Sequence, residues 1–245
     1  LGVTDVAIDP TNPGTMYIAT GDGDASDTYS AGVLKSTDSG ATWNTTGLTF
    51  TISLKRTIHR LLIHPTSTNI LFAATSSGIY KSSNNGTNWS SVKTGEHWDM
   101  EFNPSDPTVV YATTSNRIVK STDTGVNCTN LSSGLPPTTA IKRVCIAVTP
   151  ANSNVIYGLF VKTADDGFYG LYKSSDQGAT FTQQSTTPNI LGYSSNGSGA
   201  GGQGWYDLAL AVSPTNENTL FTGGINIWKS TNGGVNWTIS AHWTG

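Results

Sequence analysis

The stretch KSTDSGATW, residues 35–43, places a hydroxyl, a carboxylate and an aromatic ring within nine positions. Ser36 and Asp38 are residue types that can move a proton, and Trp43 supplies an apolar surface beside them. The same residue types can also close a tight turn, because Ser and Asp side chains accept hydrogen bonds from nearby main-chain N–H groups. The stretch therefore allows a catalytic site or a structural turn.

The stretch recurs, and its other copies separate these two interpretations. The five copies are KSTDSGATW at 35, KSSNNGTNW at 81, KSTDTGVNC at 120, KSSDQGATF at 173 and KSTNGGVNW at 229. Asn84 and Asn232 occupy the Asp position, where an amide can accept a hydrogen bond but cannot act as a general base. We therefore predict a structural turn, with Gly40 providing a positive φ angle and Trp43 packing between neighbouring units. The residues given this structural role are Ser36, Asp38, Gly40, Trp43, Asp123 and Asp176. The lysine that opens each copy is expected to be solvated or packed along its stem.

The elements that carry these turns are short strands. Before each copy a proline ends an apolar strand, and an aromatic residue follows seven positions later, as in Pro10 and Tyr17. Short alternating strands separated by turns, without helical periodicity, indicate an all-β chain. Four strands in each unit of about 40 to 50 residues are typical of a β-propeller blade. We predict a single propeller domain or segment, 1–245, with five four-stranded antiparallel blades and the option of a larger parent propeller. The expected blades are 1–50, 51–95, 96–136, 137–187 and 188–245.

The longer loops are expected at the end of each blade opposite the recurrent turn. The loop GDGDASDTYSA carries Asp22, Asp24 and Asp27, whose carboxylates could bind Ca²⁺ or could form a solvated acidic loop. An EF-hand is excluded, because the loop lacks the closing Glu and flanking helices. Apart from this possible Ca²⁺, no cofactor is expected.

Two further loops combine acidic and aromatic residues. The first, KTADDGFYG, holds Asp165 and Asp166 next to Phe168 and Tyr169. The long connection between the fourth and fifth blades adds further rings at Tyr193, Trp205 and Tyr206. An aromatic ring can stack on a sugar while a carboxylate accepts its hydroxyl hydrogens, so these residues are predicted to bind ligand. The alternative is that some of them fill gaps between blades.

The innermost strands supply a third set of candidates. Apolar residues lie two and four positions before each proline, so the alternation of a strand directs other positions toward the central channel. A mixed-charge ring is predicted there, serving as a polar ligand site or as a set of compensating ion pairs. The ring residues are Asp5, Arg60, His97, Asp99, Arg143 and Asp207.

Net charge and composition limit the classes of partner that the protein can bind. The net charge is −3 and 12% of residues are charged, so no basic field attracts nucleic acid, and no apolar run of about 20 residues predicts membrane insertion. Richness in Ser, Thr, Asn and Gly favours a secreted or cell-surface protein. Cys128 and Cys145 allow one disulfide or two thiols. The chain begins at Leu1 without an initiator Met or signal peptide, as expected for a processed or excised piece.

The five turns resemble the Asp-box, or BNR repeat, S-x-D-x-G-x-T-W. The resemblance extends over nearly the whole chain and implies a propeller similar to those of sialidases, xyloglucanase-type glycoside hydrolases, sortilin-like receptors and secreted bacterial proteins. A sialidase of this family would carry an Arg-Ile-Pro motif. The only Arg-Ile pair of this sequence, Arg117-Ile118, is not followed by proline, so a sialidase is not expected. Asp22 matches the catalytic base of xyloglucanase-type enzymes, whose second carboxylate comes from another propeller. The cysteine-rich modules of sortilin-like receptors are absent from the sequence, so a sortilin-like peptide receptor is the least favoured of the functions considered.

We therefore expect a propeller that binds a polysaccharide, another glycan or an extracellular protein and is non-catalytic as this fragment. The alternative is part of a xyloglucanase-like glycoside hydrolase whose second catalytic half lies elsewhere.

Overall fold

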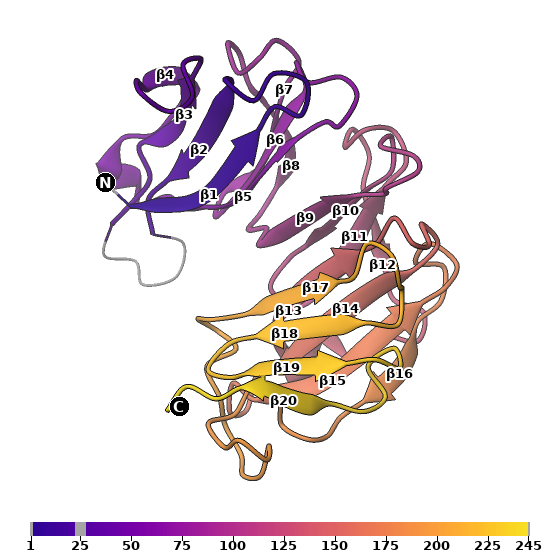
Figure 1. The fold of residues 1–245 in the computed structure, drawn as a ribbon. Coiled ribbons are helices and arrows are strands. Elements are labelled where there is room, and N and C mark those ends of the chain that lie inside the picture. Colours follow the sequence, from indigo (N-terminus) through magenta and orange to yellow (C-terminus); the bar gives the residue numbers. More distant parts are fainter. Residues whose placement is uncertain (1, 23–27, 245) are drawn as a thin grey trace. The chain divides into compact units, whose positions relative to one another are not determined.

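The structure, a computed structural model, describes residues 2–22 and 28–244. Within these residues, 20 strands form five four-stranded sheets, each made of strands consecutive in sequence (Figure 1). Neighbouring strands pair antiparallel, as in the first sheet, where Ile8 pairs with Met16. The predicted all-β class with five four-stranded units is therefore confirmed.

The strands of each sheet fall within one of the five expected ranges. The first sheet contains β1 (Val3–Ile8), β2 (Met16–Thr20), β3 (Gly32–Ser36) and β4 (Asn44–Thr49). The second contains β5 (Ile58–Ile63), β6 (Leu71–Thr75), β7 (Gly78–Ser82) and β8 (Ser90–Thr94). The third contains β9 (Asp99–Phe102), β10 (Val110–Thr113), β11 (Ile118–Ser121) and β12 (Thr129–Leu131).

The last two sheets follow the same order. The fourth contains β13 (Ile141–Val148), β14 (Ile156–Lys162), β15 (Phe168–Ser174) and β16 (Thr182–Ser185). The fifth contains β17 (Ala209–Val212), β18 (Leu220–Gly223), β19 (Ile227–Ser230) and β20 (Thr238–Ala241). Two single-turn 3₁₀ helices, η1 (Ile52–Leu54) and η2 (Thr138–Ala140), precede the second and fourth sheets. None of the described helices is long and apolar enough to cross a membrane.

The chain divides into two compact units, and each has its own core. The first unit is Leu1–Phe102, Pro107–Val110 and Ser121–Cys128; the second is Asn103–Asp106, Tyr111–Lys120 and Thr129–Gly245. In the first unit, Tyr17 and Leu48 of the first sheet pack in one cluster with Leu61 of the second. In the second unit, Tyr157 of the fourth sheet packs with Trp228 and Trp237 of the fifth. Packing between adjacent sheets therefore buries the aromatic residues. A single domain over the whole chain stays a prediction.

The recurrent turn connects the third and fourth strands of each sheet. In the first copy, the Ser36 hydroxyl donates to Asp38 Oδ1 at 2.7 Å and accepts the Gly40 N–H at 2.9 Å. The Thr42 N–H then donates to Asp38 Oδ1 at 2.9 Å. The second copy makes the same bonds with an amide, since Ser82 donates to Asn84 Oδ1 at 3.0 Å. This equivalence of Asp and Asn supports the structural role predicted for the carboxylate.

Each turn also contains two consecutive residues in the left-handed region. Gly40 has φ 86°, as the sequence predicts, but Ser39 before it has φ 61°. The corresponding first residues of the other turns also have positive φ angles: Asn85, Thr124, Gln177 and Gly233. Four of the five turns thus hold a non-glycine residue in a conformation that costs about 1 to 2 kcal/mol. The side-chain hydrogen bonds of the turn offset that cost.

The left-handed residue links the recurrent turn to the proline turn of its own sheet. The Ser39 N–H donates to the Gly14 carbonyl at 3.0 Å, and the Thr124 N–H donates to the Thr108 carbonyl at 2.7 Å. Both turns therefore lie at one end of each sheet, and the loop between the second and third strands lies at the other. The predicted separation of turns and longer loops follows from this antiparallel order.

The lysines that open the second and third copies stabilise the junction with the following sheet. Lys81 Nζ lies 5.3 Å from the Phe72 ring centroid and donates to the Thr124 carbonyl at 2.8 Å. Lys120 does the same above Tyr111, with its hydrogen bond of 2.8 Å to the carbonyl of Gln177. Of the two outcomes expected for these lysines, solvated or packed along the stem, the structure shows packing against a ring, with the ammonium group hydrogen-bonded as well. A cation over an aromatic ring and a donated hydrogen bond explain why both residue types recur.

Some apolar side chains of the first sheet and its recurrent turn are less buried than their equivalents in other sheets. Val6 and Ile8, at the apolar positions before the first proline, are about half exposed, while Leu61 at the position equivalent to Val6 is 2% exposed. Leu61 packs in one cluster with Ala7 and Tyr17 of the first sheet, whereas β1 is the first of the described strands. Trp43 is only half-buried, in contrast to the buried Trp237.

Candidate functional site

The second unit contains a hollow of about 410 Å³ at the end of the fifth sheet opposite the recurrent turn. Tyr193 and Trp243 are its two aromatic residues, and Asp207 is its only carboxylate. Gln203 adds an amide, and Gly224 and Ile225 complete the lining. Apolar rings with a few polar groups in a volume of this size are typical of a small-ligand site.

A buried asparagine holds the elements around the hollow together. Asn226, in the loop between β18 and β19, is 1% exposed and donates through Nδ2 to the Gly192 carbonyl at 2.9 Å. Its Oδ1 accepts the Trp243 N–H at 3.4 Å. Trp243 Nε1 in turn donates to the Tyr193 carbonyl at 3.4 Å. Asn226 therefore ties the chain after β20 to the long connection before β17, and this brings the two aromatic rings to one hollow.

The two acid-and-aromatic loops predicted from the sequence lie together in this unit. The Asp165 carboxylate accepts the N–H groups of Gly167 at 3.1 Å and Gly201 at 3.2 Å. Asn189 bridges the same segments, accepting the Phe168 N–H at 3.0 Å and donating to the Gly201 carbonyl at 2.8 Å. Asp165 thus positions the connection, and these bonds use both of its oxygens.

Asp166 and Phe168 differ from their predicted roles as ligand contacts. Asp166 Oδ1 lies 2.7 Å from Lys142 Nζ, so its charge is balanced within the fold. Phe168 is 1% exposed and packs in the core with Leu171 and Trp228, so its ring cannot stack on a sugar. The ligand-contact prediction for Phe168 is wrong because the alternation of β15 turns this side chain inward. Tyr169 is half-buried.

Trp205 and Tyr206 form an exposed aromatic pair on the long connection. Their ring centroids lie 5.3 Å apart, and both side chains are exposed. Arg143 holds their backbone, because its Nη1 donates to the carbonyls of Trp205 and Tyr206, each at 2.8 Å. Arg143 therefore acts in this structure as a support for the connection that leads to Asp207.

The first unit contains a separate polar cluster around Arg60. Its guanidinium lies 2.7 Å from Glu101, 3.6 Å from Asp99 and 3.8 Å from Asp5. Asp5 also accepts the Leu61 N–H at 2.7 Å, which joins β1 to β5. The sequence predicted Arg60, Asp99 and Asp5 on one side of the inner strands but missed Glu101. Since Asp207 belongs to the other unit, a single ring containing all of these charges stays a prediction.

The environment of Glu101 in this cluster shifts the pKa of its carboxyl. Burial raises the pKa of the Glu101 carboxyl to about 7, although Arg60 opposes part of that rise. Asp99 and Asp5 raise it further, because a third negative charge in the same cluster is unfavourable. The cluster can therefore exchange a proton near neutral pH.

The remaining candidates lie in the first unit. Asp22, the predicted catalytic base, follows β2, and its N–H donates to the Thr28 carbonyl at 2.6 Å. Asp24 and Asp27 of the predicted calcium loop lie outside the described residues, so that calcium site stays a proposal. His97 is 1% exposed, and its Nδ1 lies 2.8 Å from the Gly95 carbonyl oxygen. Burial lowers the pKa of His97, which favours its neutral form.

Sequence reasoning missed Trp243, Gln203, Gly224 and Ile225 of the hollow in the second unit, and also the supporting Asn226. Trp243 and Gln203 carry no repeat signal, and Asn226 lies in a short loop that resembles an ordinary turn. Trp243 lies two residues after the end of the last strand, where an aromatic residue outside the repeat could have been noted. Only the fold shows that this residue and Tyr193, 50 positions earlier, belong to one site.

Comparison with known proteins finds partial similarity to xyloglucanases. The chain is 37% identical over 98 residues to a xyloglucanase of Paenibacillus sp, covering 37% of this chain and 10% of that protein. It is 31% identical over 105 residues to a xyloglucanase of Hypocrea jecorina (strain QM6a), covering 40% of this chain and 12% of that protein. The chain thus spans only about a tenth of the length of these relatives. No family model matches it.

Solved structures show the same class of fold. The GH74 xyloglucanase of Xanthomonas campestris aligns with a TM-score of 0.71 and 17% identity, covering 97% of this chain and 38% of that one. The GH74 enzyme of Niastella koreensis aligns with a TM-score of 0.69 and 23% identity, covering 100% of this chain and 39% of that one. At these identities the likeness establishes the fold, which is that of five β-propeller blades.

Proposed function

We propose that the chain is part of a glycoside hydrolase-type protein and that it holds a polysaccharide of the xyloglucan kind. The observation that carries this proposal is the hollow in the second unit, where Tyr193, Trp243 and Asp207 come together. The partial similarity to two xyloglucanases supports the substrate class. As a partner of such a polysaccharide, the protein would act outside the cell or at its surface.

The side chains of the hollow match the chemistry of a neutral sugar ring. A pyranose has an apolar face that can pack on Tyr193 or Trp243, and hydroxyl groups around its edge. The Asp207 carboxylate accepts hydroxyl hydrogens, while the Gln203 amide can both donate and accept. The two rings and two polar groups can therefore bind one sugar unit and fix its orientation.

A polysaccharide binding assay with single-site variants tests this proposal. Affinity electrophoresis or calorimetry with xyloglucan should show binding weakened about tenfold or more in Trp243→Ala and Tyr193→Ala, a loss of about 1.4 kcal/mol. Phe221→Ala is the matched control, since Phe221 is also an exposed aromatic residue but does not line the hollow. Equal affinity in all three variants and the parent chain would remove the hollow as the binding site.

The second candidate function is glycoside hydrolysis by a longer protein of which this chain would be a part. The similarity to two xyloglucanases favours it. Asp22 would serve as its general base, with the second carboxylate supplied by another part of the protein. We expect this chain alone to bind without cleaving. A reducing-sugar assay of the longer protein and its Asp22→Asn variant tests the role, because a catalytic Asp22 requires a loss of turnover without a loss of binding. Turnover by the Asp22→Asn variant at the parent rate would assign the base to another residue.

A further inference from the structure

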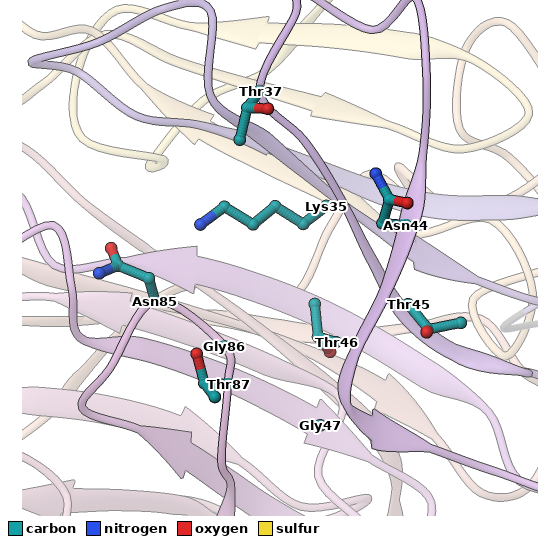
Figure 2. Close-up of a pocket in the computed structure, with 9 residues that line it drawn as sticks. All are labelled: Lys35, Thr37, Asn44, Thr45, Thr46, Gly47, Asn85, Gly86 and Thr87. Atoms are coloured by element: carbon teal, nitrogen blue, oxygen red, sulfur yellow. The ribbon is translucent and has the colours of Figure 1, made fainter.

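A second hollow, of about 410 Å³, lies in the first unit at the junction of the first and second sheets. One wall comes from β3 and β4, with Lys35, Asn44, Thr45 and Thr46 (Figure 2). The other wall is the recurrent turn of the second sheet, with Asn85 and Thr87. Within the described part of the chain, none of the nine residues that line this hollow is acidic or carries an aromatic ring. The hollow thus combines one cation with hydroxyl and amide groups.

Lys35 differs from the equivalent lysines at the other junctions. Lys81 and Lys120 each donate a hydrogen bond of 2.8 Å to a main-chain carbonyl, and Lys173 lies 3.1 Å from Glu217 Oε1. Among the described residues, the Lys35 ammonium has neither a hydrogen-bond nor an ion-pair partner, and it lies 5.3 Å from the Tyr17 ring centroid. Its ammonium is therefore available to an anion from solution.

The surroundings of Lys35 are fixed by the fold. Tyr17 is 1% exposed, and its hydroxyl donates to the Asn85 carbonyl at 3.2 Å, so the ring beneath the lysine is held in place. The Gly47 N–H donates to the Gly86 carbonyl at 2.8 Å and joins the two walls. In Figure 2 the Lys35 side chain is extended, with Nζ directed toward Asn85. The hollow is thus formed before any ligand binds, which limits the entropy lost on binding.

We propose that this hollow binds the carboxylate of an acidic sugar, a hexuronate residue, with Lys35 as its counter-ion. The ammonium supplies a charge-assisted hydrogen bond to the carboxylate. Threonine hydroxyls and the amides of Asn44 and Asn85 can satisfy the sugar hydroxyls. The volume falls within the range of small-ligand sites. Asp38, the carboxylate of the first recurrent turn, is hydrogen-bonded to Thr42 and Ser36, and does not line the hollow.

This site is distinct from the aromatic hollow that carries the proposed function. It lies at the recurrent-turn end of its sheets, in the first unit, and it selects for charge, whereas the other hollow selects for the apolar face of a neutral sugar. Its affinity should be modest, in the range of about 1 mM, because a solvent-exposed ion pair contributes little. Binding should also weaken as salt is added.

The test is an NMR or calorimetric titration of the chain with glucuronate, galacturonate, glucose and inorganic phosphate. We expect both uronates to bind, glucose to bind about three- to fivefold more weakly, and Lys35→Met and Lys35→Gln to lose about three- to fivefold in uronate affinity. Lys229→Met is the matched control, since Lys229 lies over Phe221 in the fifth sheet, outside the hollow. Trp243→Ala should leave uronate binding unchanged, which separates this site from the proposed function.

Three results would overturn the proposal. Phosphate bound as tightly as the uronates would reduce the hollow to a general anion site. Equal binding of glucose and glucuronate would remove the role of charge. Unchanged uronate affinity in both Lys35 variants, with their folding verified by circular dichroism, would place the uronate elsewhere.

Discussion

Lys81 reaches across a sheet junction and donates a hydrogen bond to the carbonyl of Thr124 at 2.8 Å, while its ammonium lies over the Phe72 ring. Thr124 is a β-branched residue with φ 55°. The acceptor is thus the carbonyl of the strained residue of the next recurrent turn. This relationship connects the three recurrent features of the sequence: the lysine, the aromatic residue after the proline, and the turn.

Replacing Lys81 tests the energetic value of this junction. Lys81→Met keeps most of the stem but removes the hydrogen bond and the cation over the ring, so we expect a loss of about 1 to 2 kcal/mol in the free energy of unfolding. Lys229→Met should lose less, because among the described residues Lys229 contacts the Phe221 ring and donates no hydrogen bond to a further turn. Urea denaturation followed by tryptophan fluorescence measures both. Equal losses of unfolding free energy in the two variants would contradict a stabilising role for the hydrogen bond between Lys81 and Thr124.

The two left-handed positions of the fifth turn should differ in tolerance. A Cβ on Gly234, which has φ 84°, would collide with Cδ2 of the buried Leu171, so Gly234→Ala should destabilise by about 2 to 4 kcal/mol. Gly233 occupies the position that holds Asn85 in the second turn. Gly233→Asn should therefore cost about 1 kcal/mol or less. Thermal unfolding of both variants gives the comparison, and the reverse order of stabilities would contradict the packing argument.

The turn carboxylates should make stability depend on pH in acid. Hydrogen bonds from Thr42 and Ser36 lower the pKa of Asp38 to about 2 from its ordinary value of 3.8. Hydrogen bonds likewise lower the pKa values of Asp123 and Asp176 to about 2. A carboxyl with a depressed folded-state pKa contributes stability above its unfolded pKa and loses it as the pH falls through the folded pKa. Stability should therefore fall between about pH 4 and pH 2.

Asparagine variants isolate this effect. The triple variant Asp38→Asn, Asp123→Asn, Asp176→Asn should show a smaller loss of stability from pH 4 to pH 2, measured by urea denaturation at each pH. The reverse variant Asn84→Asp should show a larger one. An unchanged pH slope in both would mean that the turn bonds do not favour the ionised carboxylate.

The Arg60 cluster predicts the opposite pH dependence. The pKa of Glu101 is raised to about 7 from an ordinary 4.5, so its contribution is fully present below about pH 4.5 and is lost as the pH rises through 7. Glu101→Gln should therefore gain stability relative to the parent chain between pH 5 and pH 8. Glu217→Gln is the contrasting control, since hydrogen bonding by Asn152 lowers the pKa of Glu217. A relative loss for Glu101→Gln over this range would show that Arg60 dominates over burial.

Most of the fold could be predicted because its determinants are local and repeated. Five copies of one turn, each after a proline and an aromatic residue, set the strand order. Asn84 in place of Asp indicated that the turn requires a hydrogen-bond acceptor and not a proton carrier. The site was harder to predict. Phe168 and Tyr169 are adjacent aromatic residues, yet Phe168 lies in the core and Tyr169 is only half-buried. Trp243 and Asn226 belong to no repeat, so no spacing marked them.

The sequence by itself determined the five four-stranded sheets and the end of each sheet at which its turns lie, since hydrogen bonding within a hairpin depends on residues close in the chain. Only the tertiary structure decided which side chains share a hollow. Tyr193 and Trp243 meet because the buried Asn226 bonds to both segments. Lys35 is left available while Lys81 is bound, because adjacent sheets pack with small differences at each junction. Such contacts depend on side-chain packing over long sequence separations, which local pattern does not encode.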